Sequence, residues 1–189
     1  MFAERGYDAV STAEVCRVAG VSNGSMFHFF PSKAALFGSL YIRALRSYQN
    51  AILRALERSS SAQAGIRSTV LSHARWVVSN PELAKLLHEQ RHADPGRSVQ
   101  DEIRALNYAK ATRISDWLEP HVSAGDIREM ELAVFVSLVF GPVYLLTLYT
   151  IRKEDHRRLQ SAARILTDAA WASVSGARRR PKAGSGKGR

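Results

Sequence analysis

Residues 19–33 read AGVSNGSMFHFFPSK, and this stretch decides how the fold of the whole chain is interpreted. A turn of small residues, 19–22, separates two short helical patterns, and Pro31 ends the second pattern. Gly20 can adopt the left-handed backbone conformation that a tight turn between helices requires. Two short helices joined in this way predict a helix-turn-helix, whose second helix fits the major groove of DNA.

Helix start signals flank this stretch and mark its elements. Ser11 and Glu14 have the spacing of a capping box, in which each side chain satisfies a backbone N–H of the other residue. Ser22 and Ser32 are placed to cap the two helices that follow, and the helix after Ser32 is expected to cover about 33–57. That long helix should join the N-terminal module to the rest of the chain.

The remaining sequence also predicts helices, because alternation with period two is nearly absent. Asn80 followed by Pro81 is a typical helix start, and Asp126 with Glu129 has the spacing of a second capping box. The expected helices cover about 66–78, 81–92, 98–119, 126–152 and 155–175. The fold class is therefore all-α, with a helix-turn-helix domain over 1–40, a larger helical domain over 41–175 and a basic tail over 176–189.

The composition is that of a globular protein in a reducing compartment. Of the 189 residues, 46% are hydrophobic and 23% are charged, which is ordinary for soluble domains. The single Cys16 excludes an intramolecular disulfide and suits the cytoplasm. Of the net charge of +10, six charges lie in residues 176–189, which hold no acid, so the other residues carry +4. The tail is expected to be disordered, and it either supplements phosphate binding or only aids solubility.

The longest apolar run covers 132–151. Its length allows a membrane span. The polar Ser137 and Thr147 within it, and the lack of flanking loops of a membrane kind, favour instead a helix buried on both sides. Gly141 and Pro142 should kink this helix, because proline removes a backbone hydrogen bond and clashes with the preceding turn. No membrane association is expected.

Residues 2–37 resemble the DNA-binding domain of TetR-family transcriptional repressors. In that family AGVSxGT is followed by LYxxFxxKxxL, and this chain has AGVSNGS followed by Met26, Phe27, Phe30, Lys33 and Leu36 at the corresponding positions. The match covers about a fifth of the chain. The later helices agree in number and length with the family's ligand-binding and dimerisation domain, but they hold no motif of that specificity.

The resemblance implies which residues contact DNA. It places Thr12 at a phosphate contact, Ala13 where some members carry a base-reading side chain, and Lys33 at a phosphate-gripping position near a helix N-terminus. Asparagine can pair with adenine through two hydrogen bonds, which makes Asn23 a candidate base reader. The other implied DNA-binding residues are Ser22, Gly24, Ser25, Phe27 and His28.

The aromatic rings of the stretch have different expected roles. Phe30 and Phe29 should anchor the core of the module together with Met26, and Phe27 should lie on the DNA side. The family usually has tyrosine at the position of Phe27, where its hydroxyl donates to a phosphate. The loss of one such neutral hydrogen bond costs about 0.5–1.5 kcal/mol, so DNA binding should weaken without being abolished.

The resemblance also concerns the start of the chain. In the family a full helix precedes the sequence LFAERGY and packs behind the recognition helix, whereas here Met1 stands at the leucine of that motif. Without such a helix, Val15 and Val18 would face water. We therefore expect either that the true start lies upstream of Met1 or that the chain is a truncated version.

Residues 88–92 read HEQRH, which matches the HExxH pattern of zinc proteases. The spacing places His88 and His92 on one helical face. A catalytic zinc site needs a third protein ligand and an open position, and no GxxH follows the motif. A solvated helix face is therefore favoured over metal or anion sensing and over catalysis. We expect no catalytic residues, no metal and no cofactor, and hence no enzyme.

The middle helices carry aromatic rings with a single polar group, which suit a mostly apolar small molecule. The candidate ligand-binding residues are His73, Trp76, Tyr108, Trp117, Phe140 and Tyr144, although such residues more often belong to the core. The last two helices are apolar on wide faces, and in the family they pair across a two-fold axis, which implies a homodimer.

The expected function is a dimeric repressor that binds double-stranded operator DNA and is released by a small-molecule effector. The alternative is a helical sensing or interaction protein whose DNA binding is impaired by its shortened N-terminus.

Overall fold

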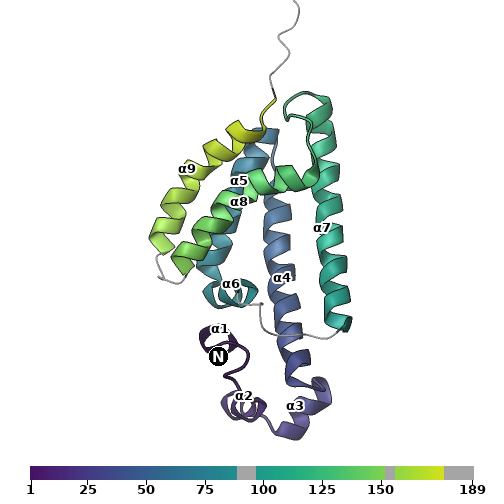
Figure 1. Ribbon diagram of the computed structural model, residues 1–189, viewed down its shortest axis with the longest axis vertical. Coiled ribbons are helices and arrows are strands. Elements are labelled where there is room, and N and C mark those ends of the chain that lie inside the picture. The colour runs from purple at the N-terminus through teal and green to yellow at the C-terminus, as the bar shows by residue number, and fades with distance from the viewer. Residues whose placement is uncertain (89–96, 152–155, 177–189) are drawn as a thin grey trace, which may run out of the picture.

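The computed structural model describes residues 1–88, 97–151 and 156–176, and every regular element within these ranges is a helix. The helices in chain order are α1 (Phe2–Arg5), α2 (Thr12–Ala19), α3 (Asn23–Phe29), α4 (Lys33–Glu57), α5 (Ala62–Ser79), α6 (Pro81–His88), α7 (Arg97–Ser123), α8 (Leu132–Ile151) and α9 (His156–Val174). Figure 1 shows α1 to α3 gathered at one end of the molecule, with α4 rising from them into the larger helical part. The all-α prediction is confirmed.

The 25-residue helix α4 connects the two parts of the molecule. Ser32 caps it, as the sequence predicts, by accepting a 3.0 Å hydrogen bond from the backbone N–H of Ala35. Near its start, α4 contributes Leu36 and Ala44 to the hydrophobic core of the N-terminal module. Near its end it contributes Leu53 to the core of the larger part. One continuous helix therefore belongs to both cores.

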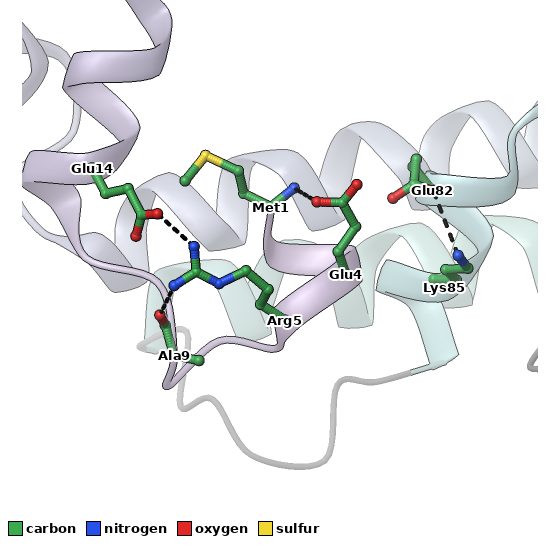
Figure 2. Close-up of polar contacts among 7 residues, drawn as sticks. All are labelled: Met1, Glu4, Arg5, Ala9, Glu14, Glu82 and Lys85. Carbon is green, nitrogen blue, oxygen red and sulfur yellow. Dashed lines mark hydrogen bonds and ion pairs between the residues drawn. The ribbon is translucent and has the colours of Figure 1, made fainter.

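Arg5 joins α1 to the connection before α2 and to α2 itself through polar contacts (Figure 2). Its guanidinium lies 2.5 Å from the carboxylate of Glu14 and donates to the carbonyl of Ala9 at 2.7 Å. Ser11 accepts a 3.2 Å hydrogen bond from the backbone of Glu14, so one half of the predicted capping box is present. The other half is wrong: the Glu14 side chain binds Arg5, because a charge-assisted hydrogen bond is stronger than one to a neutral N–H. Gly20 ends α2 with φ 68°, which confirms the predicted left-handed turn.

The predicted end of one helix near Pro120 is wrong. Helix α7 continues through Pro120 to Ser123. A proline removes only its own N–H, and here it stands in the last turn. The carbonyl of Pro120 still accepts a 3.0 Å hydrogen bond from Ala124, so the chain leaves the helix one turn later than expected.

The predicted helix start at Asp126 and Glu129 is also wrong, because α8 begins at Leu132. The carbonyl of Asp126 instead accepts a 2.8 Å hydrogen bond from Gly176, and Ile127 forms an antiparallel bridge with Ser175. These contacts with the end of α9 hold the segment extended. A long-range pairing has overridden the local capping signal.

The apolar helix α8 is not buried on both sides as the sequence suggests. Within the described residues it is the helix long and apolar enough to cross a membrane, yet only 22% of its most apolar window is buried. One side packs into the main core through Phe135 and Val139, while Val134, Leu145 and Leu148 are exposed. Figure 1 shows α8 and α9 side by side. An apolar surface of this kind on a single chain marks an interaction site.

A glycine lets α7 approach α5 closely. A Cβ atom added at Gly65 would lie 2.4 Å from Cζ2 of Trp117. Real Cβ contacts are never that short, so the indole fills the space that any other residue would need. Trp117 also packs against the main core, and its position therefore depends on Gly65.

We predict that Gly65→Ala destabilises the fold by about 1–3 kcal/mol, because the indole has to move within a packed core. Urea unfolding followed by circular dichroism measures this change. Gly24→Ala is the matched control: its nearest neighbour is Ser22 Oγ at 3.8 Å, and alanine favours a helix over glycine by up to about 1 kcal/mol. A Gly65→Ala variant as stable as the parent chain would contradict this account of the α5–α7 contact.

Candidate functional site

The N-terminal module presents a polar surface on α3. Asn23, Gly24, Ser25 and His28 are all exposed on this helix. Ser22 caps it by accepting a 3.0 Å hydrogen bond from the backbone of Ser25. Figure 1 shows α3 at the end of the molecule, below the start of α4. A ligand as large as a DNA duplex could reach these side chains.

The aromatic rings of α3 divide differently from the prediction. Met26 is buried and Phe30 packs partly against the module's core, as expected. Phe27 is exposed, also as expected. Phe29 is 74% exposed, so its predicted place in the core is wrong. On so short a helix only Met26, and Phe30 directly after the helix, face the core. Phe29 instead lies against His28, with ring centroids 5.1 Å apart.

Helix α2 carries the other predicted DNA contacts. Thr12 is its first residue and is half-buried, and Ala13 beside it is exposed. Cys16 is buried on the opposite side, as a small core residue. Val18 is 62% exposed on the same helix.

Lys33 opens α4 and is partly engaged within the module. Its ammonium lies 4.3 Å from the centre of the Tyr7 ring and 3.5 Å from the carbonyl oxygen of Asp8. Both contacts are weak enough for the flexible side chain to exchange them for a phosphate oxygen. The position at the N-terminus of a long helix is one at which anions are favoured.

A cavity of about 390 Å³ lies in the larger part of the molecule, between α4, α5, α6, α7 and α8. Its wall is mostly apolar and aromatic, as expected for a small-molecule site. The residues that line it are Tyr41, Leu45, Tyr48, Ile52, His73, Trp76, Val77, Ala84, Leu87, His88, Lys110, Ile114, Val136, Ser137, Phe140, Gly141 and Tyr144.

Four of the six candidate ligand residues lie at this cavity, namely His73, Trp76, Phe140 and Tyr144. The other two do not. Tyr108 is 77% exposed on α7, and Trp117 is seated against Gly65 and packs on His121 with ring centroids 4.5 Å apart. Both were chosen by residue type. Tyr108 faces solvent, and Trp117 faces inward but packs against Gly65 and does not line the cavity.

Several cavity residues were missed from the sequence although signals existed. Tyr41 and Tyr48 stand at helical spacing with Leu45 and Ile52, so they form one stripe of α4. His88 was expected on a solvated face, but it lines the cavity and its Nδ1 lies 3.2 Å from the hydroxyl of Tyr144.

A buried hydrogen-bond chain fixes the protonation of His73. The hydroxyl of Thr147 donates to the carbonyl of Val143 at 2.9 Å, so its oxygen accepts from Nε2–H of His73 at 2.8 Å. Nδ1 of His73 then has no proton and accepts from the hydroxyl of Tyr48 at 2.8 Å. Burial, assisted by nearby His88, lowers the pKa of His73 to about 4, so the imidazole is neutral at physiological pH.

His88 and Trp76, two other polar side chains at the cavity, also add no charge. Burial also lowers the pKa of His88. The indole N–H of Trp76 donates to the hydroxyl of Ser47 at 3.1 Å. The histidines therefore add polarity to the cavity without adding charge.

The HEQRH motif receives no support as a metal site from the part of the chain that the structure describes. His88 is the last residue of α6, and His92 lies outside the described residues. Among residues 1–88, 97–151 and 156–176, no group of three histidine, cysteine or acidic side chains is close enough to hold a metal ion.

The neutral state of His73 predicts a pH-dependent stability. Its pKa is about 4 in the folded chain and about 6.5 when unfolded. The unfolded chain therefore binds the proton more readily, and this contribution to stability is complete above about pH 6.5 and is lost as the pH falls toward about 4. The loss should reach on the order of 3 kcal/mol.

Urea unfolding between about pH 7 and pH 5 tests this expectation. His73→Gln should make the fall in unfolding free energy with decreasing pH shallower, whatever its effect at neutral pH. His28→Asn, which removes an exposed imidazole, should keep the slope of the parent chain. Equal slopes in the parent and His73→Gln would show that His73 does not titrate as its burial implies.

Comparison with known proteins agrees with this geometry. A profile of the family described as bacterial regulatory proteins, tetR family, matches residues 1–40. The nucleoid occlusion factor SlmA of Haemophilus ducreyi (strain 35000HP / ATCC 700724) is 34% identical over 87 residues, which are 44% of this chain and 42% of that protein. The HTH-type transcriptional regulator YhgD of Bacillus subtilis (strain 168) is 24% identical over 140 residues, 72% of each chain. The aligned region thus spans less than half the length of SlmA.

Solved structures share the fold over almost the whole chain. A TetR family transcription regulator from Marinobacter aquaeolei VT8 superposes with a TM-score of 0.76 at 19% identity, covering 93% of this chain and 90% of that one. The regulator FadR of Bacillus subtilis, solved in complex with stearoyl-CoA, gives a TM-score of 0.73 at 16% identity, covering 92% and 93%. The profile match assigns residues 1–40 to the tetR family of bacterial regulatory proteins, and the solved regulators share the fold of nearly the whole chain.

Proposed function

We propose that this protein is a ligand-responsive transcriptional repressor that binds a two-fold related operator as a homodimer and leaves it when a small molecule binds. The observation that carries the proposal is the path of α4. This helix starts beside the exposed face of α3 and forms one wall of the cavity along Tyr41, Leu45, Tyr48 and Ile52. Such a protein works on DNA in the cytoplasm and needs no catalytic group.

The residues proposed for DNA contact form two groups: some contact base edges, and others contact phosphates. Asn23, Ser25 and His28 are exposed on α3 and suit contact with base edges in the major groove. Thr12 and Lys33 stand at helix starts, where they suit phosphate contacts that fix the register of the protein on the duplex. Phe27 lacks the hydroxyl of tyrosine and supplies only apolar contact, for example with a thymine methyl group.

Two helices connect the cavity to the DNA-binding module. Helix α4 belongs to both cores. Helix α6 contributes Leu86 to the core of the module, and Leu87 packs against both cores while it also lines the cavity. A ligand that separates the cavity walls therefore shifts α4 or α6 and moves α3. Because two recognition helices must enter successive grooves, a change in their separation lowers DNA affinity.

The exposed face of α8 and α9 is the proposed dimer interface. Exposed apolar side chains on α8 include Val134, Leu145, Leu148 and Tyr149, and Ile165 on α9 is 74% exposed. Two-fold pairing of this face would bury these side chains and place two copies of α3 for a two-fold related operator. The largely apolar cavity wall makes a small molecule with a substantial apolar body the proposed effector. The stearoyl-CoA bound to FadR is a ligand with such a body.

We predict that Asn23→Ala weakens binding to DNA from upstream of the protein's own gene by about tenfold or more, because an asparagine–adenine pair contributes about 1–3 kcal/mol. Lys33→Ala should weaken binding to all sequences alike and reduce the salt dependence by about one charge. Gel shifts at several salt concentrations measure both effects. Asn50→Ala, at an exposed asparagine of α4, is the control and should bind like the parent. Failure of the parent chain to shift this DNA at low salt would instead favour a sensing protein that does not bind DNA.

The dimer is tested by placing a charge on the α8–α9 face. Leu145→Arg and Ile165→Arg should each convert a dimer into a monomer, because an unpaired charge would be buried in an apolar interface. Sedimentation velocity measures the mass in solution. Tyr108→Arg makes the matched control at an exposed aromatic residue of α7 and should leave the dimer intact. A parent chain that sediments as a monomer would exclude this interface.

A further inference from the structure

Lys110 occupies a position on α7 where the helix is otherwise apolar. The residues that share its side of the helix, at spacings of three and four, are Ile103, Leu106, Ile114 and Trp117. Each of these is at least half-buried, whereas Ala109 beside Lys110 is exposed. The helix therefore turns Lys110 inward, and its side chain lines the cavity next to Ile114.

The ammonium of Lys110 has no partner among the described residues. No hydrogen bond or ion pair joins it to any side chain in the described ranges, although Arg104 and Arg113 on the same helix each pair with a carboxylate. Among the described residues, the lining of the cavity includes no aspartate or glutamate. Burial lowers the pKa of Lys110, and no carboxylate in the described part of the chain raises it.

The pairs between α4 and α7 show where along the cavity this cation stands. Gly38 faces Val99, Gln49 bonds to Asn107 at 3.0 Å, and Arg113 pairs with Glu57, so the two helices run parallel. Lys110 lies one turn beyond Asn107 and therefore stands level with the Ile52 end of the α4 stripe. Tyr41 marks the other end, eleven residues and about 16 Å away along the helix.

The polar groups that the described residues place at that far end are uncharged. Tyr144 lies against His88 there, with ring centroids 4.8 Å apart. Between the two ends, Tyr48 and His73 are held neutral by the buried hydrogen-bond chain. As far as the described residues line it, the cavity is thus elongated and apolar along its wall, with one cation near one end.

We propose that the effector of this cavity is an elongated apolar carboxylic acid, whose carboxylate pairs with Lys110 and whose body extends toward Tyr41. The proposal rests on the proposed function, in which this cavity is the effector site. A carboxylate fits because a partly buried cation that lines an apolar cavity favours a counter-charge, and a single negative charge is sufficient. A phosphate dianion, or a thioester that carries a nucleotide, would leave negative charge unpaired among neutral imidazoles and phenols.

The test compares two probes of equal chain length, decanoate and decanol, by isothermal titration calorimetry on the full chain without DNA. The parent chain should bind decanoate at least about tenfold more tightly than decanol, with one site per chain, as expected for a charge-assisted contact. Lys110→Met keeps the apolar stem and removes the charge. It should lose the preference for decanoate and keep its affinity for decanol.

Two further variants complete the design. Arg104→Met removes an exposed positive charge from the same helix and should bind both probes like the parent chain. Lys110→Arg keeps the charge and should retain the preference for decanoate, which decides the question even where Lys110→Met does not fold. Decanoyl-CoA should bind no more tightly than decanoate.

A parent chain that binds decanol as tightly as decanoate, or that binds neither, would overturn the proposal. A preference for decanoate that survives in Lys110→Met would also overturn it, because another group would then hold the acid. Gel shifts without any ligand test DNA binding separately. A failure of the carboxylate proposal is therefore distinguishable from a failure of the proposed repressor function.

Discussion

The rest of the structure depends on the continuity of α4. The Ser32 hydroxyl fixes the start of this helix, and its 25 residues then pass through the core of the small module and into the core of the larger part. A helix is stiff along its axis because each residue is hydrogen-bonded to the next turn. In the proposed mechanism, movement at its cavity wall would be transmitted to its first turn, where Lys33 stands beside the α1–α2 connection. A glycine pair or an internal proline would have kinked α4, and movement in one part would then have been passed less directly to the other.

Tyr48, His73 and Thr147 satisfy one another's hydrogen-bonding groups at the cavity. Buried hydroxyl and imidazole groups cost stability unless each has a partner, and the chain from Tyr48 through His73 to Thr147 gives every member one. This arrangement also keeps the histidine uncharged. Lys110, which also lines the cavity, is not joined to this hydrogen-bond chain.

The features that the sequence predicted well are those determined by neighbouring residues. The caps at Ser22 and Ser32 and the left-handed Gly20 involve only a few adjacent backbone groups, so the helix-turn-helix and the extent of α4 follow from local chemistry. The failures arise from distant contacts. The Glu14 carboxylate binds Arg5 instead of completing the capping box. The segment around Asp126 pairs with the end of α9 instead of starting a helix. The indole of Trp117 occupies the space beside Gly65 of α5. For the cavity, residue type alone could not separate the rings that face it from those that face away. Spacing along α4 carried that information, because Tyr41 and Tyr48 share one stripe of the helix with Leu45 and Ile52.

Helix α8 shows why hydrophobicity alone cannot assign a surface. The same run of apolar residues fits a membrane span, a buried core helix or an interface, because each of these environments excludes water. The structure separates the possibilities by position: Phe135, Val139 and Val143 on one side complete the main core, while Leu145 and Leu148 on the other side meet no part of the described chain closely enough to be buried. Ser137, Phe140, Gly141 and Tyr144 also line the cavity from this helix. One element therefore carries the cavity wall and the proposed dimer face, so that ligand binding and the spacing of two DNA-binding modules would depend on the same helix.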